Sequence, residues 1–146
     1  MNQLVKQLFL SLLGFWVCTV VSAQIVLVNN GKSKSRIVLT KETPVNRTAA
    51  NILQMFVQKI SGKNLPITLG QQALGKGDIW IDGELSSGVT EDGFSLSTKD
   101  GILRISGSGN GTVYGVVTLL EQYLGVDYWG ENEYSFNPAK TIELPL

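Results

Sequence analysis

The sequence predicts an α+β fold, in which a mixed β-sheet of about six or seven short strands carries two amphipathic helices packed on one face. Apolar residues recur every three or four positions between Pro44 and Gly62 and again between Gly111 and Gly125, which is the period of a helix with one buried side. The other apolar runs are short and are separated by glycine, proline and asparagine, as is typical of strands joined by turns. Helices that are apolar on one side are expected to cover one face of such a sheet.

Residues 1–23 are expected to be a signal peptide and not part of the fold. Lys6 gives a positive start, and the apolar segment Leu8–Val21 that follows is too short to span a bilayer comfortably. Val21-Ser22-Ala23 then supplies small residues where a cleavage site needs them, so that the mature chain would begin at Gln24. We therefore expect an exported protein, periplasmic or extracellular, with no membrane segment after cleavage. A short membrane anchor is the alternative.

Residues 24–146 are expected to form one domain with a modest core. Cys18 is the only cysteine and leaves with the signal peptide, so the mature domain has neither a disulfide nor a thiol nucleophile. The chain has no histidine, which removes the commonest general base and the usual zinc ligand. Its 12 basic and 12 acidic residues include no basic run beside a helix, so nucleic acid is not an expected partner. No cofactor or metal is expected.

The first half of the domain predicts two strands followed by a helix. Ile25–Val28 and Arg36–Thr40 are short runs rich in β-branched residues. Thr43 can cap the helix, Pro44 suits its first position, and Gly62 can end it in the left-handed conformation. The expected apolar stripe of this helix consists of Val45, Ala49, Ile52, Leu53, Phe56, Val57 and Ile60.

The middle of the domain predicts further strands. Leu65–Leu69 contains a proline, which favours a weak strand at the edge of the sheet. Asp78–Asp82 is a compact apolar strand, and its Trp80 is expected to lie in the core. Asp100-Gly101, between two alternating segments, is the pair preferred in a tight hairpin turn.

The second helix begins at Gly111 and ends at Gly125, and Val126–Trp129 and Thr141–Leu144 are candidate final strands. The expected apolar stripe of the helix consists of Val113, Val116, Val117, Leu120, Tyr123 and Leu124.

Two glycine-containing segments imitate phosphate-binding loops. Gly31-Lys32-Ser33 lacks the required glycine five positions earlier, where Val26 stands. Gly107–Gly111 precedes a helix but has Thr112 where a dinucleotide fingerprint needs glycine. We interpret Gly107–Gly111 as a tight turn and Gly115 as the residue that lets the helix lie close to the sheet. Anion binding at the helix N-terminus is the alternative.

Two carboxylate pairs, Glu91 with Asp92 and Glu131 with Glu133, are interpreted as solvated loop charges. Hydrolysis of a glycosidic bond usually needs two carboxylates facing each other in a cleft. Neither pair is accompanied by residues that would form one, so no catalytic residue is assigned.

Four aromatic residues gather in the segment after the second helix and are the candidate site residues. They are Tyr128, Trp129, Tyr134 and Phe136. Aromatic rings stack on sugar faces and also dock partner domains, because they combine a large apolar area with a polar edge. The domain's own core, contact with a following domain and direct contact with carbohydrate are the three interpretations.

Two long segments carry a family resemblance. Arg36–Ile67 consists of a strand and a helix that ends in an Ile-Ser-Gly turn, and Asp92–Trp129 consists of a hairpin, a glycine-rich turn and a helix. The pattern resembles the small domain that precedes the catalytic barrel in α-glucuronidases, β-hexosaminidases and related bacterial glycoside hydrolases. In the second segment it is carried by Gly93, Phe94, Ile105, Gly107, Gly111, Tyr114, Gly115, Leu120 and Gly125.

The resemblance implies a mixed sheet flanked by helices, with catalysis in a (β/α)₈ barrel of roughly 250 residues located after this domain. Residues 24–146 have no room for that barrel, because the chain ends about where it would begin. The expected function is therefore a non-catalytic accessory domain of an exported, polysaccharide-degrading enzyme of the α-glucuronidase type. The expected partner is that barrel or a second copy of the chain, with polysaccharide as a further candidate. The alternative is a stand-alone secreted module that binds carbohydrate or another protein.

Overall fold

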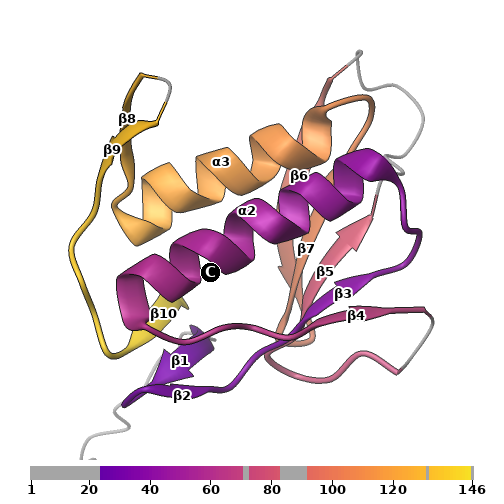
Figure 1. Cartoon of the computed structure of the whole chain (residues 1–146). Helices are drawn as coiled ribbons and strands as arrows, with labels where there is room; N and C mark the ends of the chain where they lie inside the picture. The colour runs from indigo at the N-terminus through magenta and orange to yellow at the C-terminus, as the bar shows by residue number, and fades with distance from the viewer. Residues whose placement is uncertain (1–23, 71–72, 83–91, 131, 146) are drawn as a thin grey trace, which may run out of the picture.

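The computed structural model describes residues 24–70, 73–82, 92–130 and 132–145 (Figure 1). The expected signal peptide, residues 1–23, lies outside the described residues. The described chain forms the helices α2 (Pro44–Ser61) and α3 (Gly111–Leu124). Its strands are β1 (Gln24–Asn29), β2 (Lys32–Ser33), β3 (Ile37–Leu39), β4 (Ile67–Leu69), β5 (Ile79–Asp82), β6 (Phe94–Lys99), β7 (Ile102–Gly107), β8 (Asp127–Gly130), β9 (Glu133–Ser135) and β10 (Ile142–Pro145). The predicted α+β fold is confirmed.

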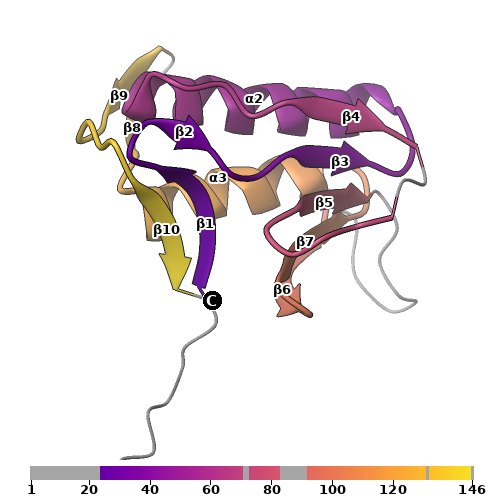
Figure 2. The same cartoon turned by 90° about the horizontal axis from the view of Figure 1, so that it is seen from below.

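The described strands are divided among three sheets instead of the single sheet expected. The largest has the order β4-β3-β5-β7-β6, and its strands are parallel except for β6, which pairs antiparallel with β7. A second, antiparallel sheet has the order β10-β1-β2, and β8 and β9 form a separate hairpin. The helices lie side by side over one face, as predicted, and β4 is the predicted edge strand (Figures 1 and 2).

The first helix has the caps that its sequence predicts. The Thr43 hydroxyl accepts a hydrogen bond from the Asn46 amide at 3.1 Å, and Pro44 is the first helical residue. Gly62 has φ of 72°, and its amide donates to the Gln58 carbonyl at 2.7 Å. The Asp100-Gly101 turn also has the predicted form, since both residues have positive φ, 56° and 75°.

The core lies between the large sheet and the helices. Alternate residues of the three central strands point to the helices in two rows, which are Ile37, Ile79 and Leu103, and Leu39, Ile81 and Ile105. The helices bury Ala49, Ala50, Leu53, Phe56, Val57 and Ile60 from α2, and Val116, Leu119 and Leu120 from α3. Ile25, Leu27, Ile142 and Leu144 extend the same core into the small sheet.

A buried polar pair joins the N-terminal ends of the helices. The Thr112 hydroxyl donates to the Asn46 side-chain oxygen at 3.2 Å, and the Asn46 side-chain amide donates to the Lys41 carbonyl at 3.1 Å. Both side chains are buried, so this bond sets how α2 and α3 lie against each other. The expected stripe of α2 is correspondingly rotated, with Asn46 buried and Val45 only half-buried.

The sheet face away from the helices carries a mixed row of side chains, Val38, Trp80, Arg104 and Ser97. Trp80 lies there, half-buried, because it alternates with Ile79 and Ile81, which face the helices. The expectation that Trp80 belongs to the core is therefore wrong. Its indole N–H donates to the Thr40 hydroxyl, and the Arg104 guanidinium lies 4.5 Å from the ring centroid.

An ion pair lies on the same face of the sheet. Arg36 donates through Nε and Nη2 to the two carboxylate oxygens of Asp78, at 3.0 and 2.9 Å. Burial acts to raise the pKa of Asp78. Hydrogen bonds from Arg36 and from the Gly75 amide outweigh burial and hold that pKa below its usual value.

Three glycines allow α3 to approach the β6–β7 hairpin. A Cβ atom on Gly107 would lie 2.2 Å from the Thr112 nitrogen, and one on Gly111 would lie 2.0 Å from the Gly93 carbonyl oxygen. A Cβ atom on Gly115 would lie 2.9 Å from Cγ2 of Ile105. The predicted tight turn and close packing are both confirmed, and no side chain fits at these positions.

Gly115→Ala is expected to destabilise the domain by about 1–3 kcal/mol, because the added methyl group must push α3 away from Ile105. Gly75→Ala is the matched control, since the nearest atom to its added Cβ would be 3.9 Å away. Urea unfolding followed by circular dichroism measures both variants. Equal stabilities of the two variants would contradict the close packing of α3.

Candidate functional site: an apolar groove between the helices

The two helices form a groove on their side away from the sheet. On α3, Val113, Val117 and Leu124 are only half-buried, although the sequence places them in the stripe that covers the sheet. On α2, Ile52 is half-buried and Met55 is 40% exposed. Each helix therefore has more apolar surface than the sheet covers, and Ile52, Met55 and Val117 of this surface line the groove.

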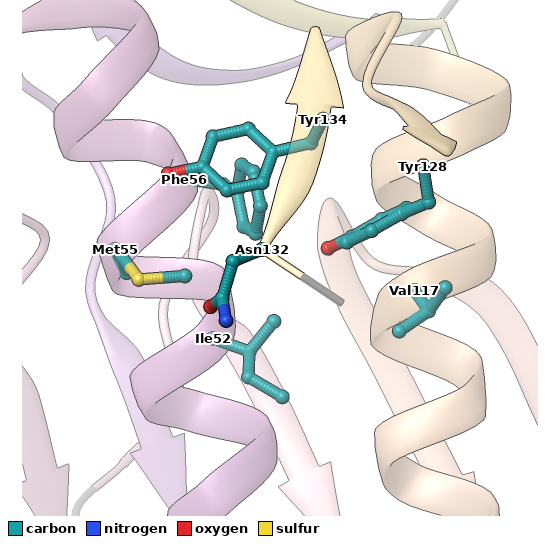
Figure 3. Close-up of a pocket in the computed structure, with 7 residues that line it drawn as sticks. All are labelled: Ile52, Met55, Phe56, Val117, Tyr128, Asn132 and Tyr134. Carbon is teal, nitrogen blue, oxygen red and sulfur yellow. The ribbon is translucent and has the colours of Figure 1, made fainter. Parts of the chain in front are cut away.

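The β8–β9 hairpin lies over the C-terminal ends of both helices and completes a cavity of about 300 Å³ at that end of the groove (Figures 1 and 3). The cavity is lined by Ile52, Met55, Phe56, Val117, Tyr128, Asn132 and Tyr134. Its size is at the lower end of the range for small-molecule sites. Among these residues none is a carboxylate or a basic group, so the lining is suited to binding and not to proton transfer.

Three of the four predicted aromatic residues are brought together around Phe56. The Tyr128 and Tyr134 rings meet the Phe56 ring edge-on, with centroids 5.5 and 5.1 Å away. Phe136 stacks on Tyr134 with centroids 6.3 Å apart. Phe56 is 2% exposed, and the sequence predicts it only as core. Its periodic position in α2 gives no sign that one edge of its ring supports the hairpin.

Trp129 is placed differently from its neighbours. It is 73% exposed and does not line the cavity, whereas the adjacent Tyr128 does. Its indole N–H donates to the Ser135 hydroxyl at 3.5 Å, which is a long contact. The hairpin thus presents an indole ring to solvent on the face that carries Ser135, whereas Tyr128 and Tyr134 on its other face line the cavity.

The two rims of the groove carry opposite charges. On the α2 side, the Lys59 ammonium donates to the Tyr134 hydroxyl and lies 4.9 Å from the centroid of that ring. On the α3 side, Glu121 lies close enough to Tyr128 to influence its hydroxyl. Burial, and then the negative charge of Glu121 and the nearby Tyr134, raise the pKa of Tyr128, which therefore stays protonated at neutral pH.

The glycine-rich turn before α3 is already occupied by a carboxylate of the chain itself. Asp92 accepts a hydrogen bond at 2.6 Å from the amide of Asn110, the residue that precedes the first residue of α3. Asp92 is thus bound to the turn and is more than a solvated loop charge. This contact favours the structural interpretation of Gly107–Gly111 over anion binding.

The other predicted carboxylates do not form a site in the described chain. Glu133 is exposed in β9, and Glu91 and Glu131 lie outside the described residues. Over residues 24–70, 73–82, 92–130 and 132–145, no group of three or more histidine, cysteine or acidic side chains is placed to hold a metal ion. Neither α2 nor α3 is apolar and long enough to cross a membrane, and no other helix is described.

Comparison with known proteins finds a weak structural likeness. No protein family matches the chain, and no curated protein is similar to it. Among solved structures, the chain is similar to a GH138 enzyme targeting pectin rhamnogalacturonan II, with 21% sequence identity and a TM-score of 0.47. The match covers 61% of this chain and 10% of that enzyme, so the chain spans about a tenth of the enzyme's length. A likeness at this level carries no argument about activity.

Trp129→Ala is expected to change the free energy of unfolding by less than about 1 kcal/mol, because the ring is mostly in solvent. The same substitution at Phe56 should cost about 3–5 kcal/mol, because that ring is buried and supports two others. Urea unfolding of both variants, with the solubility of each, makes the comparison. Loss of folding in Trp129→Ala would place the ring in the domain's own core.

Proposed function

We propose that residues 24–146 are a non-catalytic accessory domain of an exported, polysaccharide-degrading glycoside hydrolase of the α-glucuronidase type. The domain docks its helical face against a (β/α)₈ catalytic barrel that lies outside residues 24–146. The observation that carries the proposal is the apolar groove with exposed aromatic residues beside it. The large apolar side chains that are exposed on the helices and hairpin are Met55, Tyr114, Tyr123, Tyr128 and Trp129.

The composition of this surface supports a protein partner. Tyrosine, tryptophan and methionine are enriched at the centres of protein interfaces, where they lose contact with water at little entropic cost. Exposed apolar side chains that border an apolar cavity are a common feature of surfaces that bind a partner. The rim charges Lys59 and Glu121 fit the usual plan of an apolar centre with a polar border.

The sequence pattern supports the choice of family. Gly107, Gly111 and Gly115 belong to the pattern that resembles the accessory domains of glycoside hydrolases, and each occupies a position where a side chain would collide with the backbone or the sheet. A pattern that encodes such close packing reports the fold more directly than the chemistry. The assignment of catalysis to a separate barrel follows from the same resemblance.

The activity of the purified domain tests its non-catalytic role. Residues 24–146 are expected to release no product from aryl glycosides or aldouronic acids, because no acid or base lines the described cavity. Production of the full chain in a Gram-negative host tests export, with Gln24 expected as the N-terminal residue of the periplasmic product. Turnover that survives further purification would contradict the accessory role, and an unprocessed cytoplasmic chain would contradict export.

The partner is tested separately by the genomic sequence on the 3′ side of codon 146. An encoded segment of alternating strands and helices, produced as a protein and found to co-elute with residues 24–146, is the expected result. The matched variant is Tyr114→Ser, which removes an exposed ring of α3 and should weaken the complex without unfolding the domain. A barrel that binds the natural domain and its Tyr114→Ser variant equally would contradict docking through the helical face.

The exposure of Trp129 favours a second candidate, in which the domain binds carbohydrate directly. Trp80→Phe leaves Trp129 as the only tryptophan of the mature domain, so its fluorescence reports on that site alone. Titration of this variant with xylo-oligosaccharides, glucuronoxylan and chito-oligosaccharides should change the emission if a sugar ring stacks on Trp129. An unchanged spectrum at millimolar ligand would remove this candidate.

A further inference from the structure

We propose that the cavity at the hairpin end of the groove is a binding site for a small, neutral phenolic molecule. The inference goes beyond the docking role proposed above and does not depend on it, because it requires only the residues that line the cavity. The size of the cavity, its apolar walls and its hydrogen-bonding groups together select this class of ligand.

The size of the cavity admits one substituted ring. Its volume is about 300 Å³. An apolar cavity of about 150 Å³ lined by aliphatic and aromatic side chains holds a benzene molecule. The present cavity therefore has room for a benzene ring with small substituents, and it is too small for an oligosaccharide.

The walls of the cavity favour an aromatic ring. The lining includes the rings of Phe56 and Tyr134, and Ile52 and Val117 add aliphatic walls from the two helices (Figure 3). The Met55 thioether is flexible and packs favourably against aromatic rings. An aromatic ligand can make edge-on contacts of the kind that Phe56 already makes with Tyr134. A sugar would instead bring several hydroxyl groups, and most of them would lie against apolar walls without a partner.

Two neutral hydrogen-bonding groups converge on the cavity from the hairpin. Figure 3 shows the Tyr128 hydroxyl and the Asn132 side chain pointing into it. Neither side chain has a hydrogen-bond partner among the described residues. Burial raises the pKa of Tyr128, so that its hydroxyl keeps its proton at neutral pH. A phenol hydroxyl both donates and accepts, and it can therefore pair with both groups.

The charges near the cavity select against an anion. None of the described residues that line the cavity carries a charge. Lys59 already donates to the Tyr134 hydroxyl, and the negative charge of Glu121 acts on Tyr128. A carboxylate in the cavity would lose its water without gaining a free cation, and it would lie near that negative charge. The ligand is therefore a neutral phenol and not an aromatic acid.

Titration of the purified, ¹⁵N-labelled chain with p-cresol, followed by NMR, tests the proposal. p-Cresol is expected to bind at one saturable site at millimolar concentration and to shift the amide signals of Ile52 and Val117. Benzoate at neutral pH should bind at least about tenfold more weakly. Val117→Trp fills the cavity and should weaken p-cresol binding by about tenfold or more. Tyr114→Trp is the matched control, because it adds the same ring to an exposed position of α3 outside the cavity, and binding should stay within about twofold.

Tyr128→Phe removes one hydroxyl and leaves the shape of the cavity unchanged. This variant should bind p-cresol about three- to tenfold more weakly, because a hydrogen bond is lost. Its binding of toluene, which has no hydroxyl group, should stay within about twofold of the natural chain. The contrast separates the loss of a hydrogen bond from a loss of folding, since unfolding would weaken the binding of both probes.

The site is overturned if p-cresol does not bind up to its solubility limit, or if it binds the natural chain and Val117→Trp equally. Equal weakening of p-cresol and toluene by Tyr128→Phe would contradict the assigned hydroxyl contact. A chain that co-elutes with a barrel but binds no p-cresol would leave the proposed function standing and remove this inference. Binding of p-cresol by a chain that no barrel recognises would do the reverse.

Discussion

The close approach of α3 to the β6–β7 hairpin is the constraint on which the rest of the structure depends. Gly107, Gly111 and Gly115 leave no room for a Cβ atom, so the helix lies nearer to the sheet than any other residue type would allow. The buried bond between Thr112 and Asn46 then fixes α2 beside it. With both helices held in this way, the width of the groove between them is set by the packing of the core, and the hairpin that follows α3 is directed over the groove.

Local features of the fold could be predicted from the sequence because they depend on residues close together in the chain. The caps at Thr43 and Gly62 and the turn at Asp100-Gly101 are examples, since each is determined by hydrogen bonds or dihedral angles within a few residues. The separate small sheet could not be predicted, because β1 and β10 are joined only by their pairing in space. A short apolar run does not specify which distant run it will meet.

The candidate site could be predicted in part, because some of its residues are close together in the chain and others are not. The aromatic cluster after α3 is contiguous, so its composition was visible in the sequence, whereas the two helices supply the other walls of the cavity. Val117 has the period of a core residue and yet lies in the groove, because helical periodicity indicates an apolar side without indicating what covers it. The prediction for Trp80 is wrong for a similar reason, since a strand in the middle of a sheet has two faces. Trp80 lies on the face away from the helices, where the Arg104 guanidinium stacks on the indole ring.

The pairing of β1 with β10 has a consequence for the order of folding. Ile25 of β1 is opposite Leu144 of β10, and both side chains are buried in the common core. During synthesis β1 leaves the ribosome before the other described strands, and β10 leaves after them, so the pairing of β1 with β10 cannot form on a partial domain. Contacts between such distant residues also close slowly, because most of the chain must be ordered before they are gained. The domain is therefore built to fold as one unit once β10 has been made, and a nascent chain that still lacks this strand remains without its full core.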